Sequence, residues 1–227
     1  MLGSEETRHL RDVLRLRVGD EASVFDGLGR EYLCTIEEIT KKDSTLAVAR
    51  VIEPSSPESP LDLTLAAAIL PGEKFEITVQ KAVELGVYRL QPLYTIRCEV
   101  KLGGGLGRLE RWRKIAAESA KQSGRARLME IAEPVQLTEF ISFLPAESDD
   151  ASFIFFSERH GAGFPSIKAS PKITALFGPK GGWDDSELEL ARARGFSIIT
   201  FGGRIMRAET AAIAMTAILQ HRFGDLS

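Results

Sequence analysis

The stretch LFGPKGGW (residues 176–183) decides the fold, because it ends the apolar run at 172–177 with a cluster of glycines. A second stretch of the same kind, FGGRIMR (residues 201–207), ends the apolar run at 196–201. Glycine lets a ligand approach the main chain closely, because no Cβ stands in the way. Open parallel sheets bind their ligands beyond the carboxyl ends of the strands. The two stretches therefore predict a ligand site made largely of backbone; the alternative is two tight strand–helix turns without a ligand.

Strand-like and helix-like segments alternate around these two stretches. Apolar runs predict strands at 61–70, 87–93, 152–156, 172–177 and 196–201, and apolar periodicity predicts helices at 73–85, 109–123, 138–143, 184–194 and 208–222. Asp184 and Glu187 have the spacing of a capping box. This alternation is typical of an α/β fold, with a parallel sheet covered by helices on both faces.

The segment EPSSPESP (residues 53–60) is the best candidate for a domain boundary, because it contains three prolines. Three short strands are expected before it, at 21–25, 31–38 and 45–52. Short strands of this kind, preceded by a basic N-terminal turn, indicate a small β-barrel. We therefore expect two domains, at residues 1–56 and 61–227.

The composition is that of an ordinary globular protein, since 44% of the 227 residues are apolar and 27% are charged. This balance excludes a disordered or collagen-like chain. No apolar run approaches the ~18 residues of a membrane span, and the first residues contain no apolar signal-peptide core. Cys34 and Cys98 lie far apart and form no metal-binding spacing. We therefore expect two free thiols, no metal, no membrane partner and a cytoplasmic location.

The net charge of −3 conceals a basic segment. Between residues 97 and 127 the chain has nine lysines and arginines against three glutamates, and a smaller basic cluster lies near the N-terminus. A basic surface on an acidic body is a footprint for a polyanion such as RNA, although an exposed helix also carries such charge without a partner. The expected RNA contacts are Arg8, Arg11, Arg15, Arg97, Arg111, Arg113, Lys114, Lys121 and Arg125.

The ligand expected at the glycine stretches is a nucleoside-like molecule without phosphate. The chain has neither a P-loop nor a GxGxxG dinucleotide motif. The helix after the first stretch begins with Asp184, Asp185 and Glu187, whose carboxylates would repel a phosphate. S-adenosylmethionine fits, because it combines an adenosine with a sulfonium cation. The expected contacts are Leu176, Phe177, Gly178, Pro179, Gly181, Gly182, Phe201, Gly202, Ile205, Met206, Arg207 and Thr210.

Arg204 and Arg207 lie beside the second stretch, at the expected start of the last helix. Cations at a helix N-terminus are unfavourable by ~0.3–1 kcal/mol each. Their position therefore indicates a use on an anionic partner, or on negative charge that develops during a reaction. The alternative is that they pair with Asp184, Asp185 or Glu209.

Several motifs, in their order along the chain, resemble those of a known family. They are Arg8-His9-Leu10, Glu73-Lys74, Gln80-Lys81-x-x-Glu84-Leu85-Gly86, Trp112-x-Lys114-Ile115-Ala116, Gly178-Pro179-x-Gly181-Gly182 and Arg204-Ile205-x-Arg207-x-Glu209-Thr210-Ala211. Over nearly the whole chain the sequence resembles the RsmE family of ribosomal RNA uridine-N3 methyltransferases, within the SPOUT superfamily. The chain departs from the usual family pattern in having Lys180 in place of Glu and Ala208 in place of Thr.

The resemblance implies a SPOUT trefoil-knot domain, a PUA-like β-barrel that helps to hold RNA, and a homodimer. It implies that S-adenosylmethionine is bound in the knot and leaves as S-adenosylhomocysteine. The implied reaction is methylation of N3 of a uridine in the 16S ribosomal RNA of the small subunit.

Roles for three residues follow from the implied reaction. Arg207, helped by Arg204, is expected to stabilise negative charge on the uracil oxygens, and Glu209 either takes the N3 proton or orients an arginine. One alternative is a SPOUT enzyme that methylates a ribose 2′-hydroxyl or a guanine. The other is a non-catalytic RNA-binding assembly factor.

Overall fold

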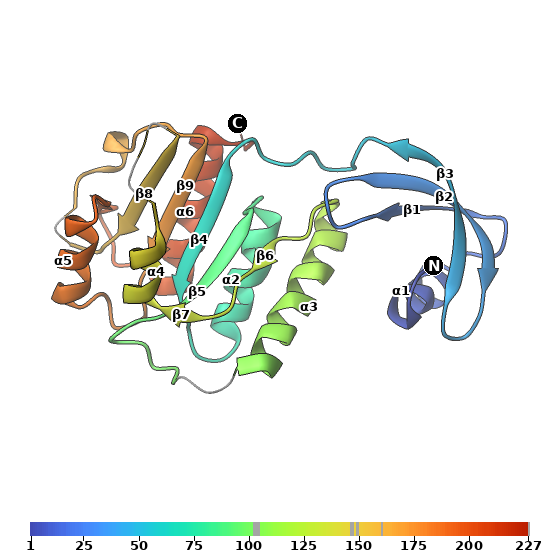
Figure 1. The fold of residues 1–227 in the computed structure, drawn as a ribbon, viewed down its shortest axis with the longest axis horizontal. Helices are drawn as coiled ribbons and strands as arrows, with labels where there is room; N and C mark the ends of the chain where they lie inside the picture. The colour runs from blue at the N-terminus through green and yellow to red at the C-terminus, as the bar shows by residue number, and fades with distance from the viewer. Residues whose placement is uncertain (102–104, 146–147, 149, 160, 227) are drawn as a thin grey trace. The chain divides into compact units, whose positions relative to one another are not determined.

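The computed structural model describes residues 1–101, 105–145, 148, 150–159 and 161–226. The chain forms two compact units: Met1–Pro57 together with Gly124–Leu128, and Glu58–Ser123 together with Met129–Ser227 (Figure 1). The first crossing between the units therefore lies inside the proline-rich segment at 53–60. The sequence pattern did not predict that residues 124–128 belong to the first unit.

The N-terminal unit is built on an antiparallel sheet with the strand order β1-β2-β3. These strands, β1 (Glu21–Phe25), β2 (Glu31–Ile39) and β3 (Ser44–Ile52), are the three that the sequence predicts. The helix α1 (Ser4–Arg8) and the π-helical turn η1 (His9–Val13) precede the sheet. The buried apolar cluster is small: Leu10, Ala22 and Ile36 form it, and Leu2, Leu16, Ile39 and Leu46 pack against it partly buried, so this unit depends on further contacts for its stability.

Later segments of the chain supply such contacts. The Glu31 carboxylate on β2 accepts hydrogen bonds from the Ser23 hydroxyl and from the N–H and hydroxyl of Ser55. Burial disfavours ionisation of this carboxyl, but the hydrogen bonds outweigh burial and hold the pKa of Glu31 below its usual value. The Ala126 carbonyl accepts from the Gly29 N–H, and the Leu128 N–H donates to the Gly27 carbonyl. The return segment at 124–128 is thus bonded to the β1–β2 turn.

The second unit contains a parallel sheet with the strand order β10-β8-β9-β4-β5-β6 and with β7 beside β5. Its strands are β4 (Asp62–Ala68), β5 (Arg89–Tyr94), β6 (Glu130–Ile131), β7 (Val135–Gln136), β8 (Ala151–Phe156), β9 (Lys172–Phe177) and β10 (Ser197–Ile199). All five of the apolar runs that were predicted to be strands form strands. The two-residue strands β6 and β7 were not predicted. β10 ends at Ile199, earlier than expected, which leaves residues 200–207 as a loop.

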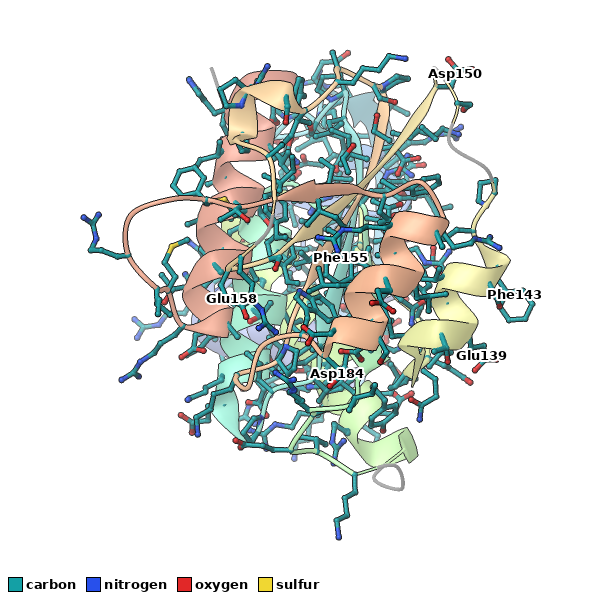
Figure 2. All side chains as sticks on the ribbon, turned by 90° about the vertical axis from the view of Figure 1, so that its left-hand side faces the viewer. Glu139, Phe143, Asp150, Phe155, Glu158 and Asp184 are labelled. Atoms are coloured by element: carbon teal, nitrogen blue, oxygen red, sulfur yellow. The ribbon has the colours of Figure 1, made fainter. Side chains whose placement is uncertain are left out.

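Helices cover both faces of this sheet (Figure 1). The helices α2 (Glu73–Glu84), α3 (Gly105–Ser123) and α6 (Ala208–Phe223) pack on one face, and α4 (Leu137–Phe143) and α5 (Asp185–Ala193) pack on the other. Figure 2 shows α4 and α5 side by side, with Phe143 pointing away from the molecule. Among the described helices, none is both long and apolar enough to cross a membrane.

Candidate active site

A cavity of about 710 Å³ lies beyond the carboxyl ends of β8, β9 and β10. This volume is in the range of small-molecule sites, about 300–1,000 Å³. We call residues 178–183, after β9, the first turn, and residues 200–207, after β10, the second turn. The cavity is lined by Lys74, Phe156, Ser157, Glu158, Phe177, Gly178, Pro179, Lys180, Gly181, Gly182, Trp183, Thr200, Phe201, Gly202, Gly203, Arg204, Ile205, Met206, Arg207, Ala208, Glu209, Ala211 and Met215.

Two positions of the first turn require glycine. A Cβ on Gly178 would lie 2.9 Å from the Trp183 ring, and this ring is fixed because its Nε1 donates to the Phe156 carbonyl at 2.7 Å. Gly182 has a φ of +69°, and a Cβ there would lie 2.8 Å from the Glu158 carboxylate. The first turn is therefore closely packed against the residues that end β8.

Two arginines from other loops neutralise the acidic start of α5, where Figure 2 labels Asp184. Arg97 donates to the Asp184 carboxylate at 3.2 Å, and Arg159 donates to Asp185 at 3.1 Å. Asp184 also caps α5, and hydrogen bonds from the Ser186 hydroxyl and N–H lower the pKa of Asp184. These carboxylates are therefore not free charges that face a ligand. This corrects the charge argument made from the sequence, which treated them as unpaired.

The second turn is open and carries unpaired charge. Ile205 is 93% exposed and Phe201 is 41% exposed. Within the described part of the chain, no ion pair or hydrogen bond engages the guanidinium of Arg204 or Arg207. Arg207 is the N-cap residue of α6, and its side chain makes no capping hydrogen bond. Both arginines line the cavity.

The alternative partners considered for these two arginines are engaged elsewhere. Asp184 and Asp185 bond to Arg97 and Arg159, as described above. Glu209 lies 3.9 Å from the Nζ of Lys74, which is near the start of α2. The pairing of Arg204 and Arg207 with these carboxylates, which the sequence left open, is therefore not observed.

The two ends of the second turn are held by other segments, with Met206 packed against the core at the end of the turn. The Gly161 N–H donates to the Thr200 hydroxyl at 2.9 Å, and the Thr200 N–H donates to the Ala162 carbonyl at 2.9 Å. The Phe201 ring meets Phe164 edge-on, with the ring centroids 6.2 Å apart. Beyond Phe201, the turn is exposed up to Met206.

Lys180, which differs from the family pattern, is paired in this structure. Its Nζ lies 3.3 Å from the Glu99 carboxylate, and both side chains are largely exposed. The change of sign at this position is therefore balanced locally, at the edge of the cavity.

The cavity brings together most of the residues that the sequence predicted. All the expected cofactor contacts line it except Leu176 and Thr210, and so do the expected catalytic residues. Leu176 is fully buried and packs toward α4 and α5, on the other face of the sheet. Thr210 is exposed on α6. We therefore leave these two residues out of the site.

Sequence reasoning missed several residues of the lining. They are Lys74, Ser157, Glu158, Thr200 and Met215. The pair Glu73-Lys74 and the residues that follow β8 were the available signals, but only the strand order places these segments at the same sheet edge.

The expected RNA contacts on α3 are exposed. Arg111, Arg113 and Lys114 form ion pairs with Glu76, Glu110 and Glu118, at 2.7, 3.2 and 4.0 Å. Lys121 is also exposed. In the N-terminal unit, Arg8 and Arg15 are exposed, whereas Arg11 bonds to Asp12 at 2.7 and 3.0 Å.

Two of the expected RNA contacts lie in surroundings that the sequence did not predict. Arg125 is only 4% exposed, so its side chain does not face solvent. Arg97 donates to the Gly181 carbonyl and to Asp184, so its guanidinium belongs to the first turn. A basic run in the sequence shows where positive charge lies along the chain, but not which side chains are buried or already bonded.

Comparison with family models gives the class of the protein. Residues 57–220 match the RNA methyltransferase domain, and residues 2–49 match the RNA methyltransferase PUA domain. The second unit is therefore an RNA methyltransferase domain, and the N-terminal sheet lies in a PUA domain.

Individual relatives define the family. The chain is 33% identical over 215 residues to the ribosomal RNA small subunit methyltransferase E of Synechocystis, covering 92% of this chain and 69% of that protein. It is 32% identical over 227 residues to the Bacillus subtilis protein of the same name, covering 94% and 87%. The Neisseria gonorrhoeae structure of this name, bound to S-adenosyl methionine, matches with a TM-score of 0.90 and 31% identity, covering 100% of this chain and 92% of that one.

The chain belongs to the ribosomal RNA small subunit methyltransferase E family. The predictions of this family, of an α/β fold with a small N-terminal β unit, and of a methyltransferase are thereby confirmed.

Proposed function

We propose that the protein transfers a methyl group from S-adenosylmethionine to N3 of a uridine in the 16S ribosomal RNA of the small subunit. The proposal rests on one observation: Arg204 and Arg207, whose guanidiniums pair with none of the residues that the structure describes, line a cavity walled by two glycine-rich turns. The names of the relatives support small-subunit ribosomal RNA as the substrate class. The Neisseria structure supports S-adenosylmethionine as the methyl donor.

The lining of the cavity fits this donor. The rings of Phe156 and Phe177 are stacked with centroids 4.8 Å apart and offer an apolar wall beside the glycine backbone. Glu158 and Glu209 supply carboxylates that suit a sulfonium cation and ribose hydroxyls. When bound, S-adenosylmethionine supplies an electrophilic methyl group.

The second turn supplies the groups that the uridine requires. Loss of the N3 proton spreads negative charge over O2 and O4 of uracil, and Arg207, helped by Arg204, stabilises this charge. Neither guanidinium gives up an internal ion pair in order to do so. Glu209, held at the cavity wall by Lys74, either takes the proton or orients an arginine.

The exposed basic residues of α3 supply an RNA surface. Their ion pairs with neighbouring glutamates are exposed and therefore weak, about 0–1 kcal/mol each, so phosphates can compete for them. Arg113→Ala and Lys114→Ala are each expected to reduce the slope of log affinity against log salt by about one. Filter binding at several salt concentrations measures this slope. A salt-independent RNA affinity would contradict the surface.

The exposed side of α6 supports a homodimer. No charged residue occurs between Glu209 and His221, although Ala211, Ala214 and Ala217 are partly exposed. A surface helix normally has a polar face, so this helix suits burial against a second copy of the chain. Light scattering is expected to give twice the 24.9 kDa of one chain, and a mass of one chain would contradict the dimer.

The decisive experiment identifies the methylated nucleoside. The protein is incubated with labelled S-adenosylmethionine and with small subunits that lack the modification, and the digested RNA is analysed by mass spectrometry. We expect N3-methyluridine. A 2′-O-methylated nucleoside or a methylguanine would replace the proposed target with that of another SPOUT enzyme. Tight RNA binding without donor binding would instead indicate an assembly factor.

A further inference from the structure

Two arginines outside the glycine turns bond to the first turn in matching ways. Arg97 lies after β5 and donates to the Gly181 carbonyl at 3.4 Å and to Asp184 at 3.2 Å. Arg159 lies after β8 and donates to the Trp183 carbonyl at 3.3 Å and to Asp185 at 3.1 Å. Each guanidinium thus joins one backbone carbonyl of the turn to one carboxylate at the start of α5. We call Arg97 and Arg159 the arginine brace.

The loops that carry the brace are themselves attached to the same region. The Ile96 N–H donates at 2.9 Å to the carboxylate of Glu187, a residue that is only 3% exposed, and this carboxylate also accepts from the Asp184 N–H. On the other side, the Nε of Arg159 lies 3.6 Å from Glu158, the carboxylate that faces Gly182. The brace is therefore part of a network that reaches the cavity wall.

We infer that Arg97 and Arg159 are positioning residues for the methyl donor, and this inference rests on the function proposed above. The first turn contains four glycine or proline residues between Gly178 and Gly182, and Gly182 has a φ of +69°. Glycine loses much conformational freedom when it is ordered. A turn that is already held in shape binds its ligand more tightly, because binding no longer has to order it.

The brace also explains why basic residues surround a site for a cation. Each guanidinium is opposed by its own carboxylate, so the brace adds no net charge to the turn. It differs in this respect from Arg204 and Arg207, which are unpaired. The brace shapes the donor site, and the second turn acts on the RNA substrate.

The experiment compares Arg97→Ala, Arg159→Ala and the double variant with Arg194→Ala. Arg194 is the matched control, because it donates to the carbonyls of Ser142 and Leu144 at the far end of α5. Calorimetry measures the Kd for S-adenosylmethionine, filter binding measures RNA affinity, and single-turnover assays at saturating donor measure the methyl-transfer rate.

Each single brace variant is expected to weaken donor binding by about three- to tenfold, and the double variant by about tenfold to a hundredfold. RNA affinity and the rate at saturating donor stay within about twofold of the parent, because the reacting groups belong to the second turn. Arg97→Lys keeps a charge opposite Asp184 but loses the forked donor, so it restores part of the affinity. Arg194→Ala leaves donor affinity unchanged.

Two results would overturn the inference that Arg97 and Arg159 position the first turn for the methyl donor. Donor affinity within about twofold of the parent in the double variant would show that the turn keeps its shape without it. A loss of RNA affinity in Arg97→Ala, with donor affinity intact, would return Arg97 to the RNA surface.

Hydrogen exchange separates the brace from the proposed function. The Gly182 N–H donates to the Pro179 carbonyl inside the turn, and it should exchange faster in the double variant. If the parent binds no S-adenosylmethionine, the proposed function fails, but faster exchange would still support the brace. Unchanged exchange in the double variant would reject the brace whether or not the parent binds the donor.

Discussion

The two glycine-rich turns follow β9 and β10, which lie on either side of β8 in the sheet, yet they differ in how the chain completes them. The first turn leads into α5 through a capping box. In this box the Asp184 side chain accepts a hydrogen bond from the helix backbone, and the Glu187 side chain accepts one from the Asp184 N–H. The second turn leads into α6 through Arg207, an arginine at the N-cap that makes no capping bond. Bonds to Arg97 and Arg159 hold the first turn, whereas the second turn is exposed from Gly202 to Ile205.

The difference indicates a division of labour within one cavity. A turn whose backbone and charges are already satisfied presents a fixed surface to a small ligand. A turn with unpaired guanidiniums at a helix N-terminus is electrostatically unfavourable by itself and gains most from a partner with negative charge. The first turn therefore suits the methyl donor, and the second suits the RNA base on which negative charge develops.

The largest expected effect is that of removing the Arg207 side chain, and it tests the different roles of the two turns. Arg207→Ala is expected to lower the methyl-transfer rate by about 10²–10³-fold, because removing a group that stabilises developing charge raises a barrier by about 2.7–4 kcal/mol. The Kd for S-adenosylmethionine should change little. Single-turnover kinetics and calorimetry measure the two quantities separately.

The control for this variant is Arg204→Ala, which removes a neighbouring unpaired guanidinium and should cause a smaller loss of rate. Methylation at the parental rate by Arg207→Ala would end the assignment of charge stabilisation to the second turn. Loss of donor affinity with an unchanged rate at saturation would move Arg207 into the donor site.

The next effect concerns stability and uses one glycine from each turn. Gly178→Ala places a Cβ 2.9 Å from the ring of Trp183, which is buried and bonded to the Phe156 carbonyl. We expect the free energy of unfolding to fall by about 1–3 kcal/mol. Gly202→Ala meets no atom within 4 Å, and we expect a change below about 0.5 kcal/mol.

Urea denaturation of both variants measures this difference. Equal stabilities for the two variants would mean that the first turn relaxes as easily as the second. The contrast between a packed turn and an open turn would then not hold in solution.

Much of this fold could be predicted because its signals are local. The signals of the capping box at Asp184 and Glu187, of the apolar run before Gly178 and of the alanine-rich last helix each lie within short stretches of sequence. The boundaries of β9, α2 and α5 accordingly agree with the predicted ranges to within about two residues, whereas β10 was predicted too long. Most lining residues of the two glycine-rich turns were predicted for the same reason, whereas Ser157 and Glu158, which follow β8 directly, were missed.

The partners of the charged residues could not be predicted, because those contacts join distant parts of the chain. Arg97 and Asp184 are 87 residues apart, and Lys74 meets Glu209 only because α2 packs against α6. The burial of Arg125 depends on the return of residues 124–128 to the N-terminal unit, for which the sequence carries no pattern. Charge argued from sequence alone therefore overstated the free negative charge at α5 and the free positive charge at Arg97.

A smaller effect tests the contact between Lys74 and Glu209, which lies at the start of α6 just after the second turn. Lys74→Met removes the cation that lies 3.9 Å from Glu209. Because Glu209 is then free to leave the cavity wall, the rate at saturating donor should fall by about three- to tenfold, while the Kd for the donor is unchanged. Lys74→Arg should restore most of the rate. A lower melting temperature without a change in rate would mean that Lys74 has only a structural role.

The smallest effect concerns the charge of Asp184, which caps α5 directly after the first turn. Hydrogen bonds from the Ser186 hydroxyl and from its backbone N–H hold the pKa of Asp184 below its ordinary value. A carboxyl with a lower pKa in the folded state stabilises the fold at pH values above its unfolded pKa of about 3.9. That contribution is lost as the pH falls through the lower, folded pKa. The folded protein is therefore less stable in acid than at neutral pH.

Asp184→Asn keeps a capping oxygen but removes the charge, so it isolates this contribution. We expect the variant to be less stable than the parent at neutral pH, and the difference in unfolding free energy to shrink as the pH falls below about 4. Ser186→Ala removes one of the two donors and should make the pH dependence of the parent shallower. Denaturation curves from about pH 7 to pH 3 measure both effects. A difference that stays constant over this range would mean that the carboxylate charge adds nothing, and that the first turn owes its shape to the packing of Trp183 and to the backbone bonds of the brace.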